Sequence, residues 1–253
     1  MESLRGNFEP MVGHSKSIQF QITDFFVPEA DKSKKSLSKK EVPDYSEEPP
    51  EYKILLYGCT MQGESICAEV INYTPYFYVR IPECFAKKDV LALKHWVTNF
   101  KLYLLDGTYH DKKYGYDRRV ISKRYSNHLV SVKLEQKKEF MGFTNNKDFH
   151  FLKITVKSLG LFNSLKYFFQ NPPKEFLTTY KEPFKLYESN IDPMLRFIHD
   201  LNILPCGWIE IPAKKYSLVC NGSQEDGVCR TTYTVELIID ISNPWIVMQQ
   251  PLL

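Results

Sequence analysis

The stretch "KLYESNIDPMLRFIHDLNILPCGWIEI", residues 185–211, predicts a strand, a helix and a second strand in immediate succession. Asp192 is a good helix N-cap, and Pro193 suits the first helical position because its missing N–H group would have no partner there. Apolar residues then recur at three- and four-residue steps, which indicates one buried stripe: Met194, Phe197, Ile198 and Leu201. This stripe contains no nucleophile, no pair of metal ligands and no glycine loop. We therefore expect the segment to support a fold rather than to carry chemistry.

Composition indicates a folded chain. Of 253 residues, 43% are hydrophobic and 14% are aromatic, which excludes a wholly disordered protein. The net charge is only +3, so nucleic-acid binding has to be argued from local patches. The 6 cysteines show no C-x-x-C spacing, which argues against a zinc site. The N-terminus lacks an apolar signal core and no apolar run approaches a membrane span, so we expect an intracellular protein that is not secreted.

The order of patterns along the chain predicts an α+β fold. From Tyr76 onward the order is strand, helix, strand, strand, helix, strand, which is the βαββαβ plan of ferredoxin-like and RNA-recognition-motif-like domains. A small β-rich (hairpin or OB-like) subdomain and a C-terminal antiparallel extension are expected beside this core. The expected parts are an N-terminal strand (1–27), a flexible charged linker (28–50), a β-hairpin subdomain (51–75), the core (76–205) with a basic insertion (106–128), and the β extension (206–253).

Three segments together resemble a known family. "INYTPYFYVRIP" (71–82) is similar to the Y-T-P-Y-F-Y-V-K-I-P stretch of delta-type B-family DNA polymerases. "EFMGFTNNKDFHFLKIT" (139–155) and "YESNIDPMLRFIHDLNILPCGWIEI" (187–211) resemble the two stretches that follow in that family, in the same order and spacing. Polymerases of large DNA viruses of eukaryotes look closest, chiefly through "GFTNNKDF". The resemblance implies the polymerase region that lies before the proofreading exonuclease.

The resemblance implies no catalysis within this segment. In the family an apolar strand ending in D-I-E follows, and it supplies the first metal-binding carboxylates of the exonuclease. Here the chain reaches "IVMQQPLL" just before that motif, and Asp240 is followed by Ile241 and Ser242 rather than by a second carboxylate. Two-metal phosphoryl chemistry requires paired carboxylates. We therefore expect no catalytic residue and no metal site here, and Mg²⁺ only in the complete polymerase.

The N-terminal segment "QFQITDFF" fits a second, shorter pattern. Gln19, Ile22, Phe25 and Phe26 occupy the positions by which partner peptides dock on sliding clamps. The same residues fit the first strand of the family. Because short motifs match easily, we favour the strand.

The segment "DKKYGYDRRVISKRY" (111–125) is the candidate nucleic-acid-binding site. Cations suit phosphates, and tyrosines can stack on bases. The alternative is a solvated insertion. The candidate residues are Lys112, Lys113, Arg118, Arg119, Lys123 and Arg124, together with Tyr114 and Tyr116.

Tyr76 and Tyr78 lie on one predicted strand, with the spacing by which RNA-recognition modules stack bases. No motif of that module accompanies them. We therefore expect them to pack within the sheet.

The function expected from the resemblance is that of an exonuclease-adjoining polymerase domain in DNA replication. It would support the other polymerase domains and contact single-stranded template at a viral replication site or in the host nucleus or cytoplasm. Two alternatives remain open: a free-standing single-stranded nucleic-acid-binding module, and an adaptor that binds a sliding clamp through Gln19 to Phe26.

Overall fold

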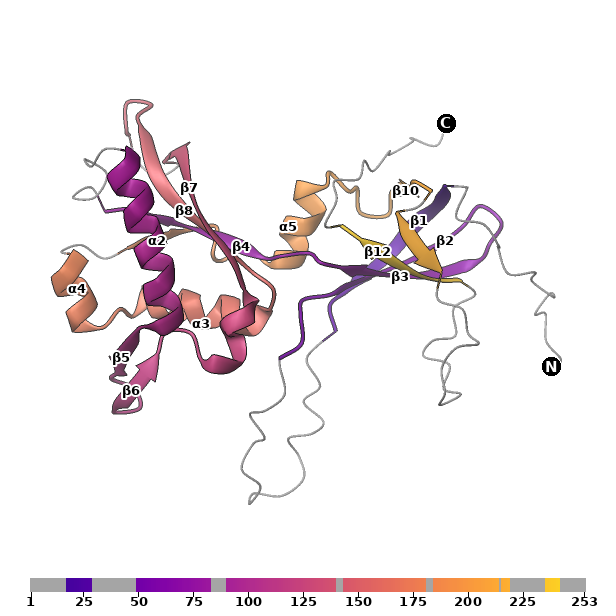
Figure 1. Ribbon diagram of the computed structural model, residues 1–253. Coiled ribbons are helices and arrows are strands. Elements are labelled where there is room, and N and C mark those ends of the chain that lie inside the picture. Colours follow the sequence, from indigo (N-terminus) through magenta and orange to yellow (C-terminus); the bar gives the residue numbers. More distant parts are fainter. Residues whose placement is uncertain are drawn as a thin grey trace, which may run out of the picture. The chain divides into compact units, whose positions relative to one another are not determined.

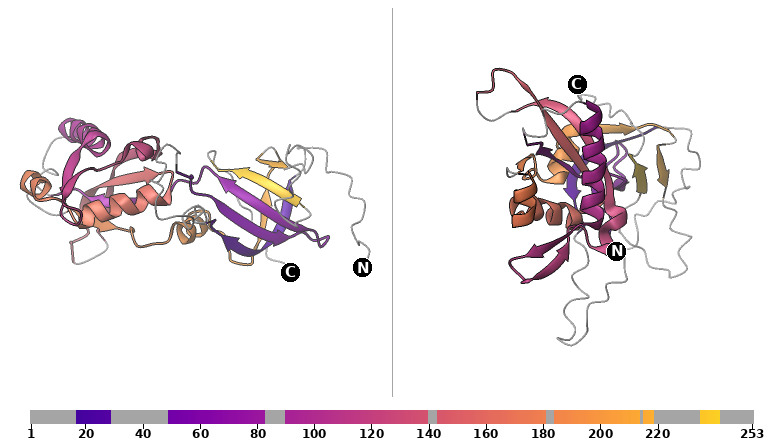
Figure 2. Two further views of the ribbon diagram at one scale, coloured as in Figure 1. Left: turned by 90° about the horizontal axis from the view of Figure 1, so that it is seen from below. Right: turned by 60° about the vertical axis from the view of Figure 1, so that its left-hand side comes forward.

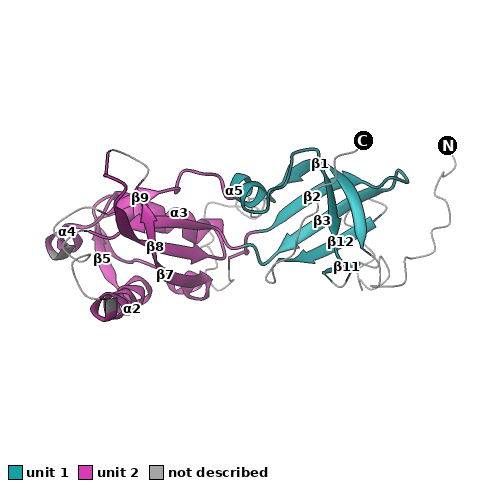
Figure 3. Cartoon of the chain, turned by 90° about the horizontal axis from the view of Figure 1, so that it is seen from above, with its two compact units in different colours: residues 1–28, 53–73, 194–253 teal, residues 29–52, 74–193 magenta. Residues whose placement is uncertain are grey.

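The computed structural model describes residues 17–28, 49–82, 90–139, 143–180, 184–213, 215–218 and 235–241. The chain divides into two compact units (Figure 3). Unit 1 consists of residues 1–28, 53–73 and 194–253, and unit 2 consists of residues 29–52 and 74–193. Among the described residues, no helix is both long and apolar enough to cross a membrane.

Unit 1 is built on a six-stranded sheet with the order β10-β1-β2-β3-β12-β11 (Figure 1). β12 pairs parallel with β3, and the other neighbours pair antiparallel. The strands are β1 (Ile18–Phe26), β2 (Ile54–Cys59), β3 (Ser65–Ile71), β10 (Trp208–Ile211), β11 (Tyr216–Leu218) and β12 (Val235–Asp240).

Alternation of apolar residues buries one face of this sheet. Ile18, Phe20 and Ile22 on β1 are all buried, as a strand with one face in a core requires. Gly58 on β2 allows β1 to approach closely, because a Cβ atom at Gly58 would lie 2.5 Å from the Phe20 ring. Helix α5 (Pro193–Asp200) begins at Pro193, as predicted, and its fully buried Phe197 contacts Tyr73 with ring centroids 5.3 Å apart.

Unit 2 is built on a four-stranded antiparallel sheet with the order β7-β8-β4-β9. Figure 2 shows this unit from two further sides. Along the chain its main elements run β4-α2-β7-β8-α3-α4-β9. Their bounds are β4 (Tyr76–Arg80), α2 (Val90–Asp106), β7 (Leu129–Lys138), β8 (Asp148–Val156), α3 (Leu159–Gln170), α4 (Lys174–Tyr180) and β9 (Lys185–Tyr187). The mixed α+β fold predicted from the sequence is confirmed.

The core of unit 2 lies between one face of this sheet and helices α2 and α3. Ser158 caps α3, because its side chain accepts a hydrogen bond of 3.4 Å from the Leu161 backbone N–H. Phe77 on β4 meets Phe162 and Phe169 of α3 edge-on. One apolar face of α3 is buried.

The C-terminal strands differ from the predicted antiparallel extension. β10 pairs with β1 and β12 pairs parallel with β3, so both belong to the sheet of unit 1. α5, predicted as part of the core at 76–205, falls mainly in unit 1. Sequence patterns specify a strand or a helix but not the element with which it pairs or packs, which explains both differences. The predicted linker at 28–50 lies almost entirely outside the described residues.

Candidate nucleic-acid interface

The basic insertion predicted at 106–128 contains a β-hairpin. β5 (Thr108–Asp111) pairs antiparallel with β6 (Tyr116–Arg119). The base of the hairpin is attached to the core of unit 2: Tyr109 meets Phe168 at 5.2 Å between ring centroids, and Val120 and Ile121 are buried. Burial raises the pKa of Tyr109. The hairpin therefore projects from a fixed base.

The turn of the hairpin is organised by Asp111. Its side chain is buried and accepts a hydrogen bond of 2.9 Å from the Lys113 backbone N–H, while its carbonyl accepts one of 2.7 Å from Gly115 N–H. Gly115 adopts φ +69, which glycine allows at little cost. Arg118 forms an ion pair with the Asp111 carboxylate at 3.5 Å. One buried carboxylate thus fixes both the turn and a cation of β6.

Cations and tyrosines gather at the tip of the hairpin. Tyr114 and Tyr116 are about half exposed, at 51% and 55%, with ring centroids 5.9 Å apart. The Lys113 ammonium lies 5.2 Å and the Arg118 guanidinium 5.9 Å from the centroid of the Tyr114 ring. Every residue from 112 to 119 is exposed. This cluster therefore offers positive charge and an accessible aromatic surface together.

The remaining predicted cations are exposed but are less closely joined to this cluster. Lys123 and Arg124 lie on the 3-10 helix η2 (Lys123–His128). Arg124 lies 5.0 Å from the ring centroid of Tyr125, a half-buried residue that packs against the core of unit 2. Of the six candidate cations, only Arg118 forms an ion pair within the described part of the chain. Lys113 and Arg124 lie over tyrosine rings instead. Unpaired exposed cations can meet phosphates without first breaking an ion pair.

The residues of the clamp-docking pattern lie in β1, between β2 and β10. Ile22 is only 1% exposed, and the Gln19 side chain donates a hydrogen bond of 3.0 Å to Glu210. Phe26 is 49% exposed and Phe25 is half-buried. A docking peptide has to present these side chains together to its partner. Ile22 could reach such a partner only if β1 left the sheet.

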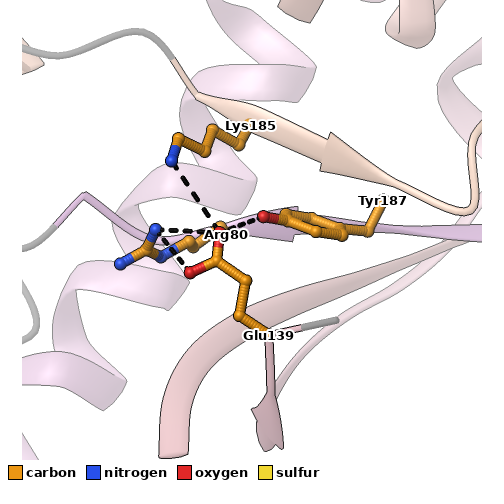
Figure 4. A network of polar contacts seen from close by, with 4 residues as sticks. All are labelled: Arg80, Glu139, Lys185 and Tyr187. Carbon is orange, nitrogen blue, oxygen red and sulfur yellow. Dashed lines mark hydrogen bonds and ion pairs between the residues drawn. The ribbon is translucent and has the colours of Figure 1, made fainter. Parts of the chain in front are cut away.

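A polar network on unit 2 was missed by reasoning from the sequence (Figure 4). The Glu139 carboxylate, at 6% side-chain exposure, forms an ion pair of 2.8 Å with Arg80 and lies 3.8 Å from the Lys185 ammonium. The Tyr187 hydroxyl donates a hydrogen bond to the same carboxylate. Burial, followed by this hydrogen bond, raises the pKa of Tyr187 to about 12. Every cationic and acceptor group of the network is satisfied, which indicates a structural role.

Among the described residues, no cluster of three or more His, Cys, Asp or Glu side chains is placed to hold a metal ion. Asp240 was considered in the sequence analysis because an exonuclease motif of the family would begin with such a carboxylate. It accepts a hydrogen bond of 2.9 Å from the Asn72 side chain. The cations and tyrosines at the tip of the hairpin β5–β6 can hold a nucleic acid, the cations by charge and the tyrosines by stacking.

Comparison with known protein families gives no matching family model. Among curated proteins, the chain is 31% identical over 172 residues to the DNA polymerase delta catalytic subunit of Dictyostelium discoideum, a match covering 65% of this chain and 14% of that protein. It is 29% identical over 205 residues to the DNA polymerase of Acanthamoeba polyphaga mimivirus, covering 81% of this chain and 10% of that protein.

Among solved structures, the family B DNA polymerase of Pyrobaculum calidifontis matches with a TM-score of 0.48 and 15% sequence identity, over 93% of this chain and 21% of that one. The chain therefore spans only a small fraction of the length of the proteins that it matches. The resemblance stated from the three sequence segments is confirmed. Over most of its length, the chain is homologous to DNA polymerase delta catalytic subunits and to viral DNA polymerases.

Proposed function

We propose that this chain is the N-terminal, exonuclease-adjoining domain of a family B DNA-directed DNA polymerase that acts in DNA replication inside the cell. The observation that carries this proposal is the similarity to a delta catalytic subunit, 31% identical over 172 residues. The segment supports the remaining polymerase domains and contacts single-stranded template. It contributes no catalytic carboxylates, and the Mg²⁺ of polymerisation and proofreading is held elsewhere in the complete enzyme.

A domain exchange tests the polymerase role. The matching segment of the Dictyostelium discoideum delta catalytic subunit is replaced by this chain, and primer extension is measured with Mg²⁺ and nucleotides. The exchanged enzyme should extend a primer well above a version from which the segment has been deleted. Extension no better than that of the deletion, from a soluble and folded exchange protein, contradicts the proposal.

We also infer that the core of unit 2 has the ferredoxin-like plan. In that plan two βαβ halves interleave, so that the first strand of each half is central. The sheet order β7-β8-β4-β9, in which β4 and β8 are central, supports this inference. The hairpin β5–β6 and η2 are then insertions between the first helix and the second strand.

The template contact is assigned to the hairpin β5–β6 and to η2. Six cations and one carboxylate, Asp117, lie between residues 112 and 124. Lys and Arg on phosphates release condensed counterions, and tyrosines stack on any base, so binding should be independent of sequence and weaken steeply with salt. The other polymerase domains would keep the template at high effective concentration, so weak intrinsic binding suffices.

A salt titration tests this contact. Binding of a fluorescein-labelled oligo(dT) to the whole chain is followed by fluorescence anisotropy at several salt concentrations. K112Q/R119Q removes two cations, neither of which takes part in an ion pair with a described residue. It should flatten the slope of log affinity against log salt concentration by about 1.4, since each phosphate contact on a single strand contributes about 0.7. K94Q/K174Q, on exposed positions of α2 and α4, removes the same charge and should leave the slope unchanged. Equal slopes for both variants contradict the hairpin assignment.

Tyr114→Ala tests the stacking contribution separately. It should weaken binding while leaving the salt slope nearly unchanged, because it removes a stacking surface and no charge. Tyr114→Trp, which keeps an aromatic surface, is its matched control and should retain binding.

The two alternative functions, a free-standing binding module and a sliding-clamp adaptor, are judged by different observations. A free-standing binding module would need micromolar or tighter affinity at physiological salt, and the same titration measures that quantity. The sliding-clamp contact through Gln19 to Phe26 is disfavoured by the burial of Ile22 within the sheet of unit 1.

A further inference from the structure

The sheet of unit 2 has a second face, opposite the one that packs on α2 and α3. Phe77 and Val79 of β4 and Leu152 and Ile154 of β8 point into the helical core. Because side chains alternate along a strand, the residues between them lie on the opposite face. That face carries aromatic residues and cations on neighbouring strands: Tyr76, Tyr78 and Arg80 on β4, Phe151 and Lys153 on β8, Lys133, Glu135 and Lys137 on β7, and Lys185 and Tyr187 on β9.

Two lysines of this face are held over tyrosine rings. The Lys153 ammonium lies 3.8 Å from the ring centroid of Tyr76, and the Lys137 ammonium lies 4.6 Å from that of Tyr78. The two rings meet edge-on, with centroids 5.7 Å apart. Hydrogen bonding to the Tyr78 hydroxyl raises the pKa of Lys137. A ring that attracts a cation fixes the direction of an otherwise mobile side chain, so these charges are oriented before any ligand arrives.

A third lysine is placed where it costs stability. Lys133 on β7 and Lys153 on β8 are direct cross-strand partners, and like charges in that position destabilise a sheet. Neither lysine has an ion-pair partner among the described residues. Lys133 is exposed and Lys153 is half-buried. An unbalanced pair of this kind is what a binding surface for negative charge requires.

Cations outnumber carboxylates on this face. Arg80 and Lys185 both lie near the Glu139 carboxylate, which also accepts a hydrogen bond from Tyr187, so one carboxylate faces two cations at that end. Beside the three ammonium groups of Lys133, Lys137 and Lys153, Glu135 lies 3.4 Å from Lys137. The Glu135 and Glu188 carboxylates both act to raise the pKa of Tyr78, so two carboxylates lie near the three ammonium groups. A surplus of positive charge therefore remains around Lys133, Lys137 and Lys153, which we call the lysine strip.

The three lysines of the strip come together across two neighbouring strands. Directly opposed side chains on such strands lie about 5 Å apart at Cβ, which applies to Lys133 and Lys153. Lys137 lies four residues farther along β7, but its side chain reaches back, so that its ammonium and that of Lys153 lie 4.6 Å and 6.0 Å from the ring centroid of Tyr78. Adjacent phosphates of one strand can contact ammonium groups gathered in this way.

We propose that the lysine strip binds the phosphate backbone of a single-stranded nucleic acid, as a site separate from the hairpin β5–β6. The phosphates contact the three ammonium groups, and Tyr76 and Tyr78 hold two of those groups in place. The rings act as supports for the cations rather than as stacking platforms, because Tyr78 is only 6% exposed. This site does not depend on the proposed polymerase role.

The same anisotropy titration with labelled oligo(dT) tests the strip on the whole chain. K133Q/K153Q should weaken binding roughly tenfold or more at about 50 mM salt and flatten the slope by about 1.4, for two lost phosphate contacts. K133R/K153R keeps the charges and should retain both affinity and slope. K94Q/K174Q again serves as the control for total charge. The melting temperature of each variant is measured, and K137Q, at an exposed position, provides a second test if the double variant is unfolded.

The outcomes separate the two sites. If K112Q/R119Q is without effect while K133Q/K153Q and K137Q weaken binding, the hairpin assignment fails and the lysine strip stands. An unchanged affinity and slope for K133Q/K153Q and K137Q overturns the strip, whatever the hairpin variants do. Equal competition by poly-glutamate and by unlabelled oligo(dT) at matched charge also overturns it, because the strip would then accept any extended polyanion.

Discussion

Arg80 on β4 and Glu139, the residue after β7, form an ion pair of 2.8 Å although β8 lies between their strands. Their side chains are only 12% and 6% exposed. Removing one partner leaves a charge buried without compensation, so Glu139→Ala should lower the free energy of unfolding by about 3–5 kcal/mol. Urea denaturation measures this change. Glu51→Ala breaks an ion pair of the same length with Lys157, but at the surface, and should cost about 1 kcal/mol or less. Equal costs would mean that Glu139 is open to solvent.

The Tyr187 hydroxyl should ionise at a higher pH than an ordinary tyrosine. Its pKa is raised to about 12 from an ordinary value of 10.0 by burial and by its hydrogen bond to Glu139. The folded state therefore holds the phenolic proton more tightly than the unfolded state, so this contribution to stability is complete below pH 10 and is lost as pH rises towards about 12. Comparing Tyr187→Phe with the original chain by absorbance at alkaline pH should show the loss of one step near pH 12. A lost step centred near pH 10 would contradict the buried hydrogen bond.

Phe197 should be the most sensitive position of α5. It is fully buried, and Phe197→Ala should cost about 3–5 kcal/mol through lost burial and the cavity left behind. Leu195 lies on the same helix at 56% exposure, and Leu195→Ala should change stability by about 0.5 kcal/mol or less. Thermal melting of both variants decides the matter. A similar loss at both positions would show that the two faces of the helix are equally covered.

Lys133→Gln should make the unliganded protein more stable. The substitution removes the repulsion with Lys153 across the β7–β8 pair, a gain of about 0.2–1 kcal/mol. Because the effect is electrostatic and partly exposed, it should shrink at high salt. Melting at low and high salt tests both statements. Lys138→Gln, at the exposed end of β7 opposite Asp148, removes a favourable pairing and should not stabilise.

The chain alone should neither extend nor degrade a primed template in the presence of nucleotides and Mg²⁺. Two-metal phosphoryl transfer requires paired carboxylates. Asp240 is hydrogen-bonded to Asn72 instead. Gel analysis of labelled primer measures both activities. Product above that of a mock preparation would refute the assignment of catalysis to other parts of the polymerase.

Local features of the fold could be predicted because short-range physics determines them. The start of α5 at Pro193, the Ser158 cap and the buried stripe of α3 all follow from neighbouring residues. The hairpin β5–β6 was not predicted within the basic segment, because every residue of β6 is exposed and no apolar alternation marks it. Of the stripe predicted to be buried on α5, only Phe197 is buried, whereas Met194, Ile198 and Leu201 are half-buried.

Ion-pair partners and strand register could not be predicted from the sequence. The cations and tyrosines of the hairpin were found from composition alone, but the ion pair of Arg118 with Asp111 needed coordinates. The same holds for Arg80 and Glu139, which are 59 residues apart. The lysine strip depends on the register that places Lys133 opposite Lys153, and a shift of one residue would have sent one of them to the other face.

Unit 1 is assembled from three separate stretches of chain, and this has a consequence for biosynthesis. β1 cannot meet β10 until the ribosome has made the residues between them, since Gln19 and Glu210 are 191 positions apart. The main stretch of unit 2, residues 74–193, is continuous and emerges first as a whole. Contacts between distant residues form slowly because closing the loop costs entropy. During synthesis β1 can pair early with β2, but its other edge, which later pairs with β10, stays open while unit 2 folds. This interval is when the nascent chain is most exposed to aggregation or to chaperone capture.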